Sequence, residues 1–365
     1  MMTQDAVNWG GRSSPAPVVG GTAAWNGLAF NPHQIWACRR AELTAFAETP
    51  FRCANGQKAT MAQIRTLPPR SHGLERMFAI GRRLVDEMMP KLKTVASGSR
   101  LALVLCLSER FDRNGKAKRF AGERAALEKD LVDRLKQQGW SPLLHTEARG
   151  HASLAFAMIE ACTALASGAL EVALVGGIET YYDPDVIDAL LQQQRLFDGE
   201  NLNSFIPGEG GAFLLLARPD VAKRARWEPL ARVESAATAQ EPAPMFALSP
   251  CQGIGLSRAL GAIADRFRKE KRQIDWWLGD LTNEDYRVHE WQLALPRASA
   301  GVSGENSTME FLPVLLGDLG AATMPTAGAI AVEGFLRGDP NAKTCLLAGS
   351  STTPDRGAVL LTRIE

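Results

Sequence analysis

The chain has 365 residues, of which 45% are hydrophobic and 22% charged. These proportions exclude disorder as the dominant state and allow one large core or two fused ones. Forty-one Lys and Arg residues against 40 Asp and Glu give a formal net charge of +1, so no global charge draws the chain to nucleic acid or to an anionic membrane, and we expect neither as a partner.

The N-terminal part of the chain is irregular. Residues 1–16 are rich in Gly, Pro and Ser and are predicted to form a flexible tail, and PVVGG then predicts a short strand that enters a turn. Residues 22–70 show no sustained period and are interpreted as an elaboration around a core. The segment GLERMFAIGRRLVDEMMP predicts a helix that ends at Pro90.

A regular pattern begins at residue 101. LALVLCL (101–107) is a continuous apolar run, which is typical of a strand covered on both faces. A helix with a leucine-rich face follows, then the short strand PLLH, a second helix ending at Gly168, and the strands VALVGG (172–177) and GAFLLLA (211–217). The predicted order is strand, helix, strand, helix, strand, strand.

The remaining residues repeat this order. ARVESA (231–236) predicts a strand, GLSRALGAIADRF a helix, IDWWLGDL another strand, and a further helix ends near Gly338. TCLLAGS (344–350) then resembles VALVGGI, and RGAVLLTRIE resembles GGAFLLLARPD. We therefore predict a duplicated α/β unit about a pseudo-twofold axis, with halves over residues 17–225 and 226–365.

The spacing of the cysteines, histidines and glycines argues against disulfide, metal and nucleotide-binding sites. The six cysteines lie far apart without a Cys-x-x-Cys pair, and no histidine has metal-ligand spacing, so neither a disulfide framework nor a metal site is expected. The Gly-Gly pairs match no P-loop or dinucleotide fingerprint, and no cofactor is expected. No secretory signal or bilayer-spanning run is visible, which favours a cytoplasmic location.

Two strings carry a family resemblance. HASLAFAMIEACTALASGALEVALVGGIET and RLFDGENLNSFIPGEGGAFLLL resemble the thiolase superfamily and, more closely, the β-ketoacyl (3-oxoacyl-ACP) synthases. The family places Phe-Asp upstream of a glycine-rich turn that enters a hydrophobic strand. The matching residues are Phe197, Asp198, Phe205, Pro207, Gly208, Glu209, Gly210 and Gly211. The resemblance spans most of the chain and implies an α/β thiolase-like fold, a duplicated α-β-α-β-α layered arrangement with two pseudo-symmetric halves.

The resemblance also implies where a nucleophile would lie. Condensing enzymes of this family carry a Cys at the N-terminus of a buried helix, about 25 residues before the Gly-Gly end of a strand, a spacing set by the helix and strand lengths. Counting back from Gly176 gives His151, and one step of register gives Gly150 or Ala152. Ser153 is the nearest hydroxyl; we interpret it as a helix cap and leave an acylated Ser as the alternative.

The two catalytic residues that the resemblance implies in the C-terminal half, His-His in synthases or His-Cys in thiolases, also have no counterpart. The corresponding turns read LGDLTNED, with Gly279 or Asp280 in the His position, and LGDLGAAT, with Gly317 or Asp318. We therefore predict no catalytic residues. The residues left as a possible pocket are His151, Ser153, Phe205, Gly208, Glu209 and Gly210.

His151 has three possible roles: filling the pocket, contacting a ligand, or catalysis. The positive end of the helix dipole is expected to lower its pKa and favour a neutral imidazole.

The resemblance implies a leading hypothesis for function. We expect a catalytically degenerate synthase-like protein that is a non-catalytic structural or regulatory partner, either of an active synthase in polyketide or fatty-acid synthesis or as an accessory protein of a type VI secretion effector. Such proteins pair as dimers through an edge strand of the N-terminal half, so the expected partners are a second copy, another thiolase-like chain, an acyl carrier protein or a secreted effector. The alternatives are an acyltransferase or condensing enzyme with a non-Cys site, and a module that binds acyl groups without chemistry.

Overall fold

The computed structural model describes residues 6–10, 15–112 and 118–364. The strands are β1 (Val7–Asn8), β2 (Val18–Asn26), β3 (Ala47–Arg52), β4 (Lys58–Met61), β5 (Leu101–Cys106), β6 (Leu143–Glu147), β7 (Val172–Thr180), β8 (Glu209–Ala217), β9 (Ala231–Gln240), β10 (Trp276–Gly279), β11 (Thr308–Phe311), β12 (Thr344–Ser350) and β13 (Asp355–Arg363).

The α-helices are α1 (Pro32–Arg40), α2 (Leu74–Leu92), α3 (Lys118–Gln137), α4 (Ser153–Ala166), α5 (Pro184–Gln192), α6 (Pro219–Arg224), α7 (Ile254–Glu270), α8 (Asp285–Ser299), α9 (Pro313–Leu316) and α10 (Thr323–Arg337). Short 3-10 turns are η1 (Glu109–Phe111), η2 (Gly150–Ala152) and η3 (Gly320–Ala322).

The main sheet has an internal symmetry. Its strand order is β6-β5-β7-β8-β2-β9-β13-β12-β10-β11, so the two halves repeat the same order outward from a short β2–β9 pairing. In the first half β5 is parallel to β6 and β7, and β8 is antiparallel to β7 and β2. In the second half β10 is parallel to β11 and β12, and β13 is antiparallel to β12 and β9. This is the predicted duplicated α/β fold.

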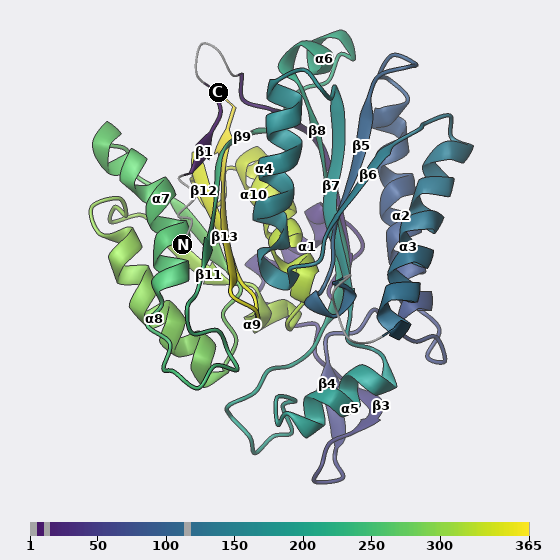
Figure 1. Cartoon of the computed structure of the whole chain (residues 1–365), viewed down its shortest axis with the longest axis vertical. Helices are drawn as coiled ribbons and strands as arrows, with labels where there is room; N and C mark the ends of the chain where they lie inside the picture. The colour runs from purple at the N-terminus through teal and green to yellow at the C-terminus, as the bar shows by residue number, and fades with distance from the viewer. Residues whose placement is uncertain (1–5, 11–14, 113–117, 365) are drawn as a thin grey trace.

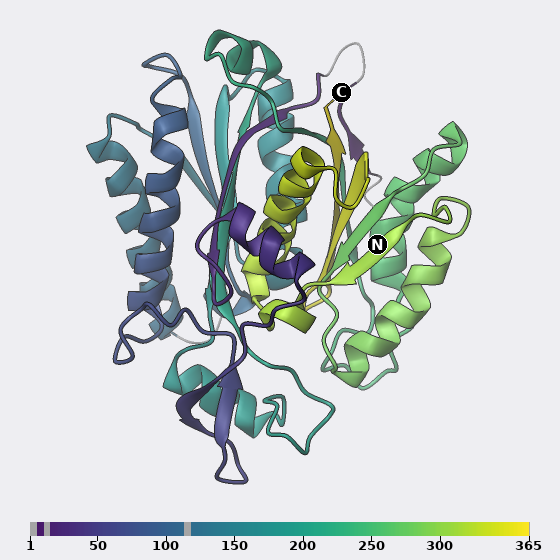
Figure 2. The same cartoon turned by 180° about the vertical axis from the view of Figure 1, so that it is seen from behind.

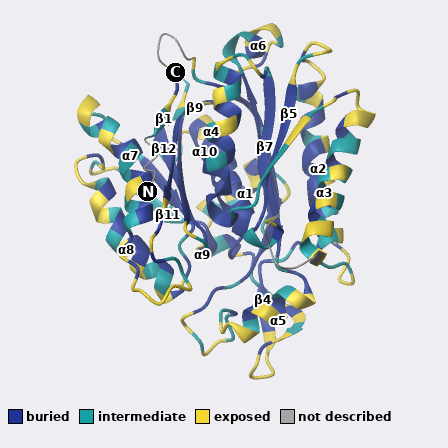
Figure 3. Ribbon diagram, viewed as in Figure 1, coloured by how far each residue is buried: buried dark blue, intermediate teal, exposed yellow. Residues whose placement is uncertain are grey.

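The helices and the two halves of the sheet form five layers. Figure 1 shows α4 and α10 between the two halves, with α2 and α3 outside the first half and α7 and α8 outside the second. Seen from behind, α1 lies against α10 (Figure 2). Strands β5, β7 and β8 are buried along their whole length because helices cover both of their faces. Figure 3 shows the exposed residues gathered on the outer helices and loops.

Part of the predicted flexible tail is ordered, which corrects that expectation for the described residues. Val7 and Asn8 pair with β9, and the ring of Trp9 is buried in the central core. Burial of an indole ring is favourable enough to fix a short segment that otherwise has only two paired residues. Residues 1–5 and 11–14 lie outside the described part of the chain.

Further elements differ from the sequence prediction. The elaboration over residues 22–70 contains helix α1 and the β3–β4 hairpin, and a helix, α5, lies between β7 and β8. Both helices begin with a recognised start signal: Asn31 and Asp183 cap them, and a proline follows each cap. Helix α2 continues past Pro90 to Leu92. Figure 1 shows β3, β4 and α5 together at one end of the molecule.

No helix in the described part of the chain is long and apolar enough to cross a lipid bilayer.

Candidate functional site

The expected nucleophile position lies where the chain enters α4. His151 is in the 3-10 turn η2, immediately before the helix, and only 3% of it is exposed. The preceding residue, Gly150, has φ +54°, and a Cβ added there would lie 2.2 Å from Glu109 Oε2. Glycine is therefore required to bring the turn this close to the buried carboxylate.

The three positions that the resemblance assigned to catalytic side chains meet in the structure. His151 Nε2 lies 2.6 Å from Asp318 Oδ1, in the segment between α9 and η3. Arg287, from α8, places Nη2 3.2 Å from His151 Nδ1 and Nη1 2.9 Å from Asp280 Oδ2. All four side chains are buried. We call His151, Asp280, Arg287 and Asp318 the central ion network.

The structure also decides between the glycine and the aspartate in each turn. Gly317 has φ +66°, and a Cβ there would lie 2.9 Å from Ile206 O; a Cβ on Gly279 would lie 2.7 Å from the ring of Trp291. Neither position accepts a side chain without rearrangement. Asp280 and Asp318 are therefore the residues of these turns that face His151 and Arg287.

Arg287 is the member of the network that the sequence analysis did not single out. Besides His151 and Asp280 it donates to the carbonyl of Ser350, 2.7 Å away, at the end of β12. It lies in the string DYRVHEW, where its spacing looks like that of any charged residue on a helix. Nothing in the local sequence distinguishes it from a solvated arginine.

The charges in the network shift each other's pKa. Burial is the largest single influence on the pKa of His151 and lowers it, but the charge and hydrogen bond of Asp318 together with the charge of Asp280 outweigh burial, and the result is a raised pKa. This corrects the expectation that the helix dipole would lower it. Burial raises the pKa of Asp318, and the closeness of His151 and Arg287 more than offsets this, so the carboxyl is held well below its usual range.

Both ring nitrogens of His151 are already engaged. An arginine has only N–H donors, so Nδ1 accepts from Arg287 while Nε2–H donates to Asp318 when the imidazole is neutral. A general base needs a lone pair directed at its substrate. For His151 to act on a ligand, it would have to give up one of these two buried contacts.

Ser153 is not the helix cap that we predicted. Helix α4 has Ala152 in the cap position, without a side-chain capping bond. Ser153 Oγ instead accepts the backbone N–H of Arg149 at 2.9 Å and donates to the carbonyl of Leu107 at 3.2 Å. The hydroxyl is fully buried, and both of its hydrogen-bonding functions are used by the backbone.

The turn between β12 and β13 closes over the start of α4. Ser351 Oγ accepts the backbone N–H of Ala152 at 3.2 Å and donates to the carbonyl of Arg149. Thr352 donates to Glu109 Oε1 through both its N–H and its hydroxyl, each at 3.0 Å. One backbone N–H at the helix start is thus satisfied by a serine, where a ligand oxyanion would need a free donor.

Among the contacts that the structure describes, the glycine-rich turn at residues 208–210 contacts the central ion network through Gly208 only, and its other residues pack elsewhere. Gly208 N–H donates to the carbonyl of Asp318 at 2.8 Å, which attaches this turn to the central ion network. Glu209 pairs with Arg76 Nε at 2.7 Å and accepts from Thr180 at 2.9 Å, with no contact to His151 among those described. A Cβ on Gly210 would lie 2.7 Å from Trp25 O, so this glycine permits close strand packing.

Phe205 lines an apolar cavity beside the network. The cavity measures about 220 Å³, and its walls include Ile206, Leu281 and Val314. It is adjacent to the network because the carbonyl of Ile206 accepts the N–H of Asp318 at 2.8 Å. A cavity of this volume can hold an apolar group such as part of an acyl chain.

Comparison with known proteins gives structural matches only. No protein-family model matches the chain, and no curated protein matches it in sequence. The ketosynthase from module 6 of the bacillaene synthase of Bacillus subtilis is 14% identical with a TM-score of 0.73, over 96% of this chain and 72% of that one.

Two further structures match over their full length. One is from a type II PKS acyl-carrier protein in complex with its ketosynthase, 13% identical with a TM-score of 0.76; the other is the ishigamide ketosynthase/chain length factor, 15% identical with a TM-score of 0.74. Each match covers 96% of this chain and 100% of the other. The chain therefore has the thiolase-like fold of ketosynthases, as its sequence predicted.

Proposed function

We propose that this chain is a catalytically degenerate, ketosynthase-like protein that acts as a non-catalytic structural or regulatory partner. The observation that carries the proposal is the buried central ion network, in which His151 bonds directly to Asp318 and Arg287 bridges His151 to Asp280. These are the positions where the resemblance implies a Cys and two catalytic side chains.

The chemistry of the network opposes acyl transfer. A condensing enzyme needs a thiolate and hydrogen-bond donors aimed at a developing oxyanion. Here the imidazole of His151 is held by two partners, and the other two positions carry carboxylates. Anionic oxygens repel a developing oxyanion, so Asp280 and Asp318 would raise the barrier to the reaction that histidines lower.

A partner chain fits the exposed edge of the first half-sheet. Strand β6 ends the sheet, pairing with β5 along one side only, and it carries the exposed side chains of Leu143 and Leu144. An apolar edge strand is a template for pairing with another chain. The ketosynthase/chain length factor among the matched structures supports a second thiolase-fold chain, identical or different, as the partner.

Two settings are compatible with such a partner. One is a polyketide or fatty-acid pathway, where an active synthase would be the second chain and an acyl carrier protein a further partner; the acyl-carrier protein complex among the matches supports this setting. The other is an accessory role beside a type VI secretion effector. Co-purification with an acyl carrier protein or with the effector separates the two.

The proposal is tested by intact-mass spectrometry after incubation with acetyl, octanoyl and malonyl thioesters, with thioester consumption followed in parallel. We expect an unchanged mass and no consumption. An adduct mapped to His151 or Ser153, or steady turnover, would overturn the proposal and favour an acyltransferase or condensing enzyme with a relocated site.

The apolar cavity favours one secondary possibility, which is binding of an acyl group without reaction. A ligand that binds only the folded state raises its melting temperature. Thermal stabilisation by octanoyl thioester that is lost when Ile206→Trp fills the cavity would support acyl binding, and equal shifts in both proteins would exclude this cavity as the site.

A further inference from the structure

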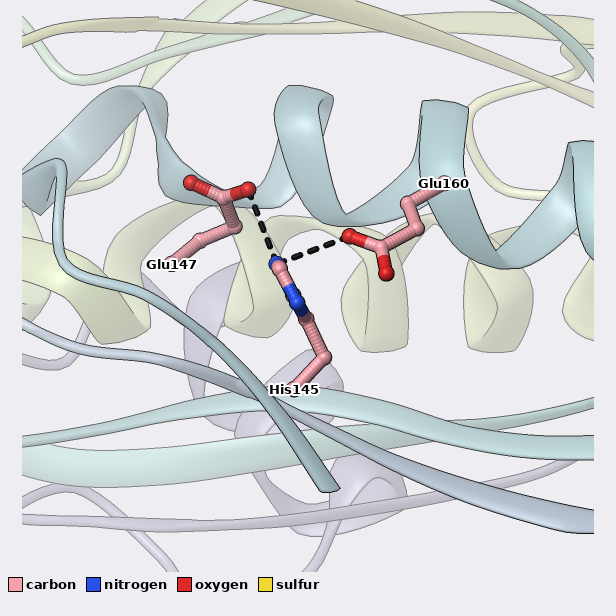
Figure 4. Close-up of side chains that lie close together, drawn as sticks. All are labelled: His145, Glu147 and Glu160. Atoms are coloured by element: carbon pink, nitrogen blue, oxygen red, sulfur yellow. Dashed lines mark hydrogen bonds and ion pairs between the residues drawn. The ribbon is translucent and has the colours of Figure 1, made fainter. Parts of the chain in front are cut away.

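A second group of ionisable side chains lies at the edge of the first half-sheet. His145 and Glu147 are two residues apart on β6, so they project from the same face of the strand. Glu160 approaches them from α4. Figure 4 shows the two carboxylates directed at the same ring nitrogen of His145.

One ring nitrogen of His145 lies within ion-pair distance of two carboxylate oxygens at once. His145 Nε2 lies 2.7 Å from Glu160 Oε2 and 3.0 Å from Glu147 Oε1, and the three atoms lie within 4.8 Å of one another. A ring nitrogen carries at most one hydrogen, so it donates fully to only one of the two oxygens. A cation between the three atoms would satisfy both carboxylates and the nitrogen lone pair together.

The arrangement is close to that of a three-ligand metal site. Zn²⁺ binds His nitrogen and carboxylate oxygen at about 2.0–2.2 Å with tetrahedral angles, which places neighbouring donors about 3.3 Å apart. To reach this separation from His145 Nε2, Glu160 would have to move outward by about 0.6 Å and Glu147 by about 0.3 Å, and the side chain of Glu160 is 49% exposed. The side chain of His145 is 38% exposed, so water can reach the fourth position.

Neighbouring groups hold the ligands in place. Glu147 Oε2 accepts from Arg149 Nε at 2.7 Å, which leaves Oε1 directed at His145. Arg149 is in turn paired with Asp355 at 3.1 Å, so its charge is shared between two carboxylates. A hydrogen bond to the outer oxygen of a ligating carboxylate is the usual support for a metal ligand.

We propose that His145, Glu147 and Glu160 form a binding site for a divalent transition-metal ion, with Zn²⁺ as the best fit to one imidazole and two carboxylates. The bound ion would tie the edge strand β6 to α4, the helix that follows His151. The site does not rest on the loss of catalytic residues, although two of its ligands lie on β6, the strand through which we propose that a partner pairs. It differs from our expectation that the chain has no metal site.

The test is a calorimetric titration of the chelator-treated, tag-free protein with ZnCl₂. We expect about one Zn²⁺ per chain in the wild type, abolished in His145→Ala and weakened at least tenfold in Glu160→Gln. The matched control is His33→Ala. His33 is a surface histidine, with 54% of its side chain exposed, that also faces a carboxylate, Glu333, at 3.1 Å. This control is expected to keep the wild-type affinity.

A second readout follows the ion by its spectrum and its effect on stability. Co²⁺ in a four-coordinate site gives visible absorption bands, which we expect in the wild type and not in His145→Ala, and Zn²⁺ should raise the melting temperature of the wild type alone. Equal Zn²⁺ affinity in the wild type and His145→Ala, or no Zn²⁺ binding by the wild type at 100 µM, would overturn the proposal.

Discussion

His151 Nε2 lies 2.6 Å from Asp318 Oδ1 across 167 positions of the sequence, and this buried contact joins the two halves of the fold at their centre. Each residue lies at the entrance to a helix of the central layer: His151 in η2 before α4, and Asp318 in the segment that leads through η3 into α10. The pseudo-symmetry of the fold therefore brings the two turns together, and the charges that they carry determine what this centre does.

Replacing Asp318 by Asn is expected to destabilise the fold. The substitution removes the carboxylate that pairs with His151 and whose charge Arg287 also balances, and breaking a buried ion pair costs about 3–5 kcal/mol. The free energy of unfolding from urea titration measures the loss. Asp133→Asn, which breaks the exposed i,i+4 pair with Lys129, is the control and should leave the transition unchanged. Equal effects of both substitutions would contradict a structural role for Asp318.

The stability difference between wild type and Asp318→Asn is expected to depend on pH. The folded-state pKa of His151 is raised above its ordinary value of 6.5, so its contribution is fully present below pH 6.5 and is lost as pH rises through the folded-state pKa. The pKa of Asp318 is lowered from 3.8, so its contribution is present above pH 3.8 and is lost as pH falls through the folded-state pKa.

The pair of His151 and Asp318 therefore stabilises the folded state most between pH 3.8 and pH 6.5, the ordinary pKa values of the two side chains. Urea unfolding at about pH 6 and pH 9 should show a larger gap between wild type and variant at the lower pH. A gap that grows toward pH 9 would mean that His151 is held neutral in the folded state and that its pKa is not raised.

The fold was predictable because its signal lies in local patterns. Continuous apolar runs mark β5, β7 and β12, and the similarity of β7 to β12 reveals the duplication. The sequence pattern does not predict helices α1 and α5, because each has only nine residues and is too short to show a helical period of apolar residues. The only local signal of each helix is a capping residue followed by a proline. The boundary between the halves near residue 225 stays a prediction.

The site was predictable in position but not in chemistry. Counting along a helix and a strand placed His151, and two turns placed Asp280 and Asp318, because such spacings follow from element lengths. Arg287 could not be found this way, since only packing brings it inside. The same is true of Glu160, whose approach to His145 depends on how α4 packs against β6.

Gly150→Ala is expected to destabilise the start of α4. The position has φ +54°, and the added methyl would overlap the carboxylate of Glu109, so the cost is about 1–3 kcal/mol. Gly261→Ala is the matched control: this glycine is inside α7 with nothing within 4 Å of an added Cβ, and alanine should stabilise the helix by up to about 1 kcal/mol. Opposite signs in thermal unfolding are the expected result; a neutral Gly150→Ala would show that the turn can relax.

Leu143→Lys is expected to weaken association of the chain through β6. Its side chain is on the edge strand with 64% of the residue exposed, and a lysine there places a charge where a second strand would pack. Light scattering after size-exclusion chromatography should show a dimer for the wild type and a shift toward monomer for the variant. Leu336→Lys, on a leucine at the end of α10 with 54% of the residue exposed, should leave the mass unchanged. A dimer that persists in Leu143→Lys and dissociates in Leu336→Lys would place the interface at the end of α10 and not at β6, against our proposal.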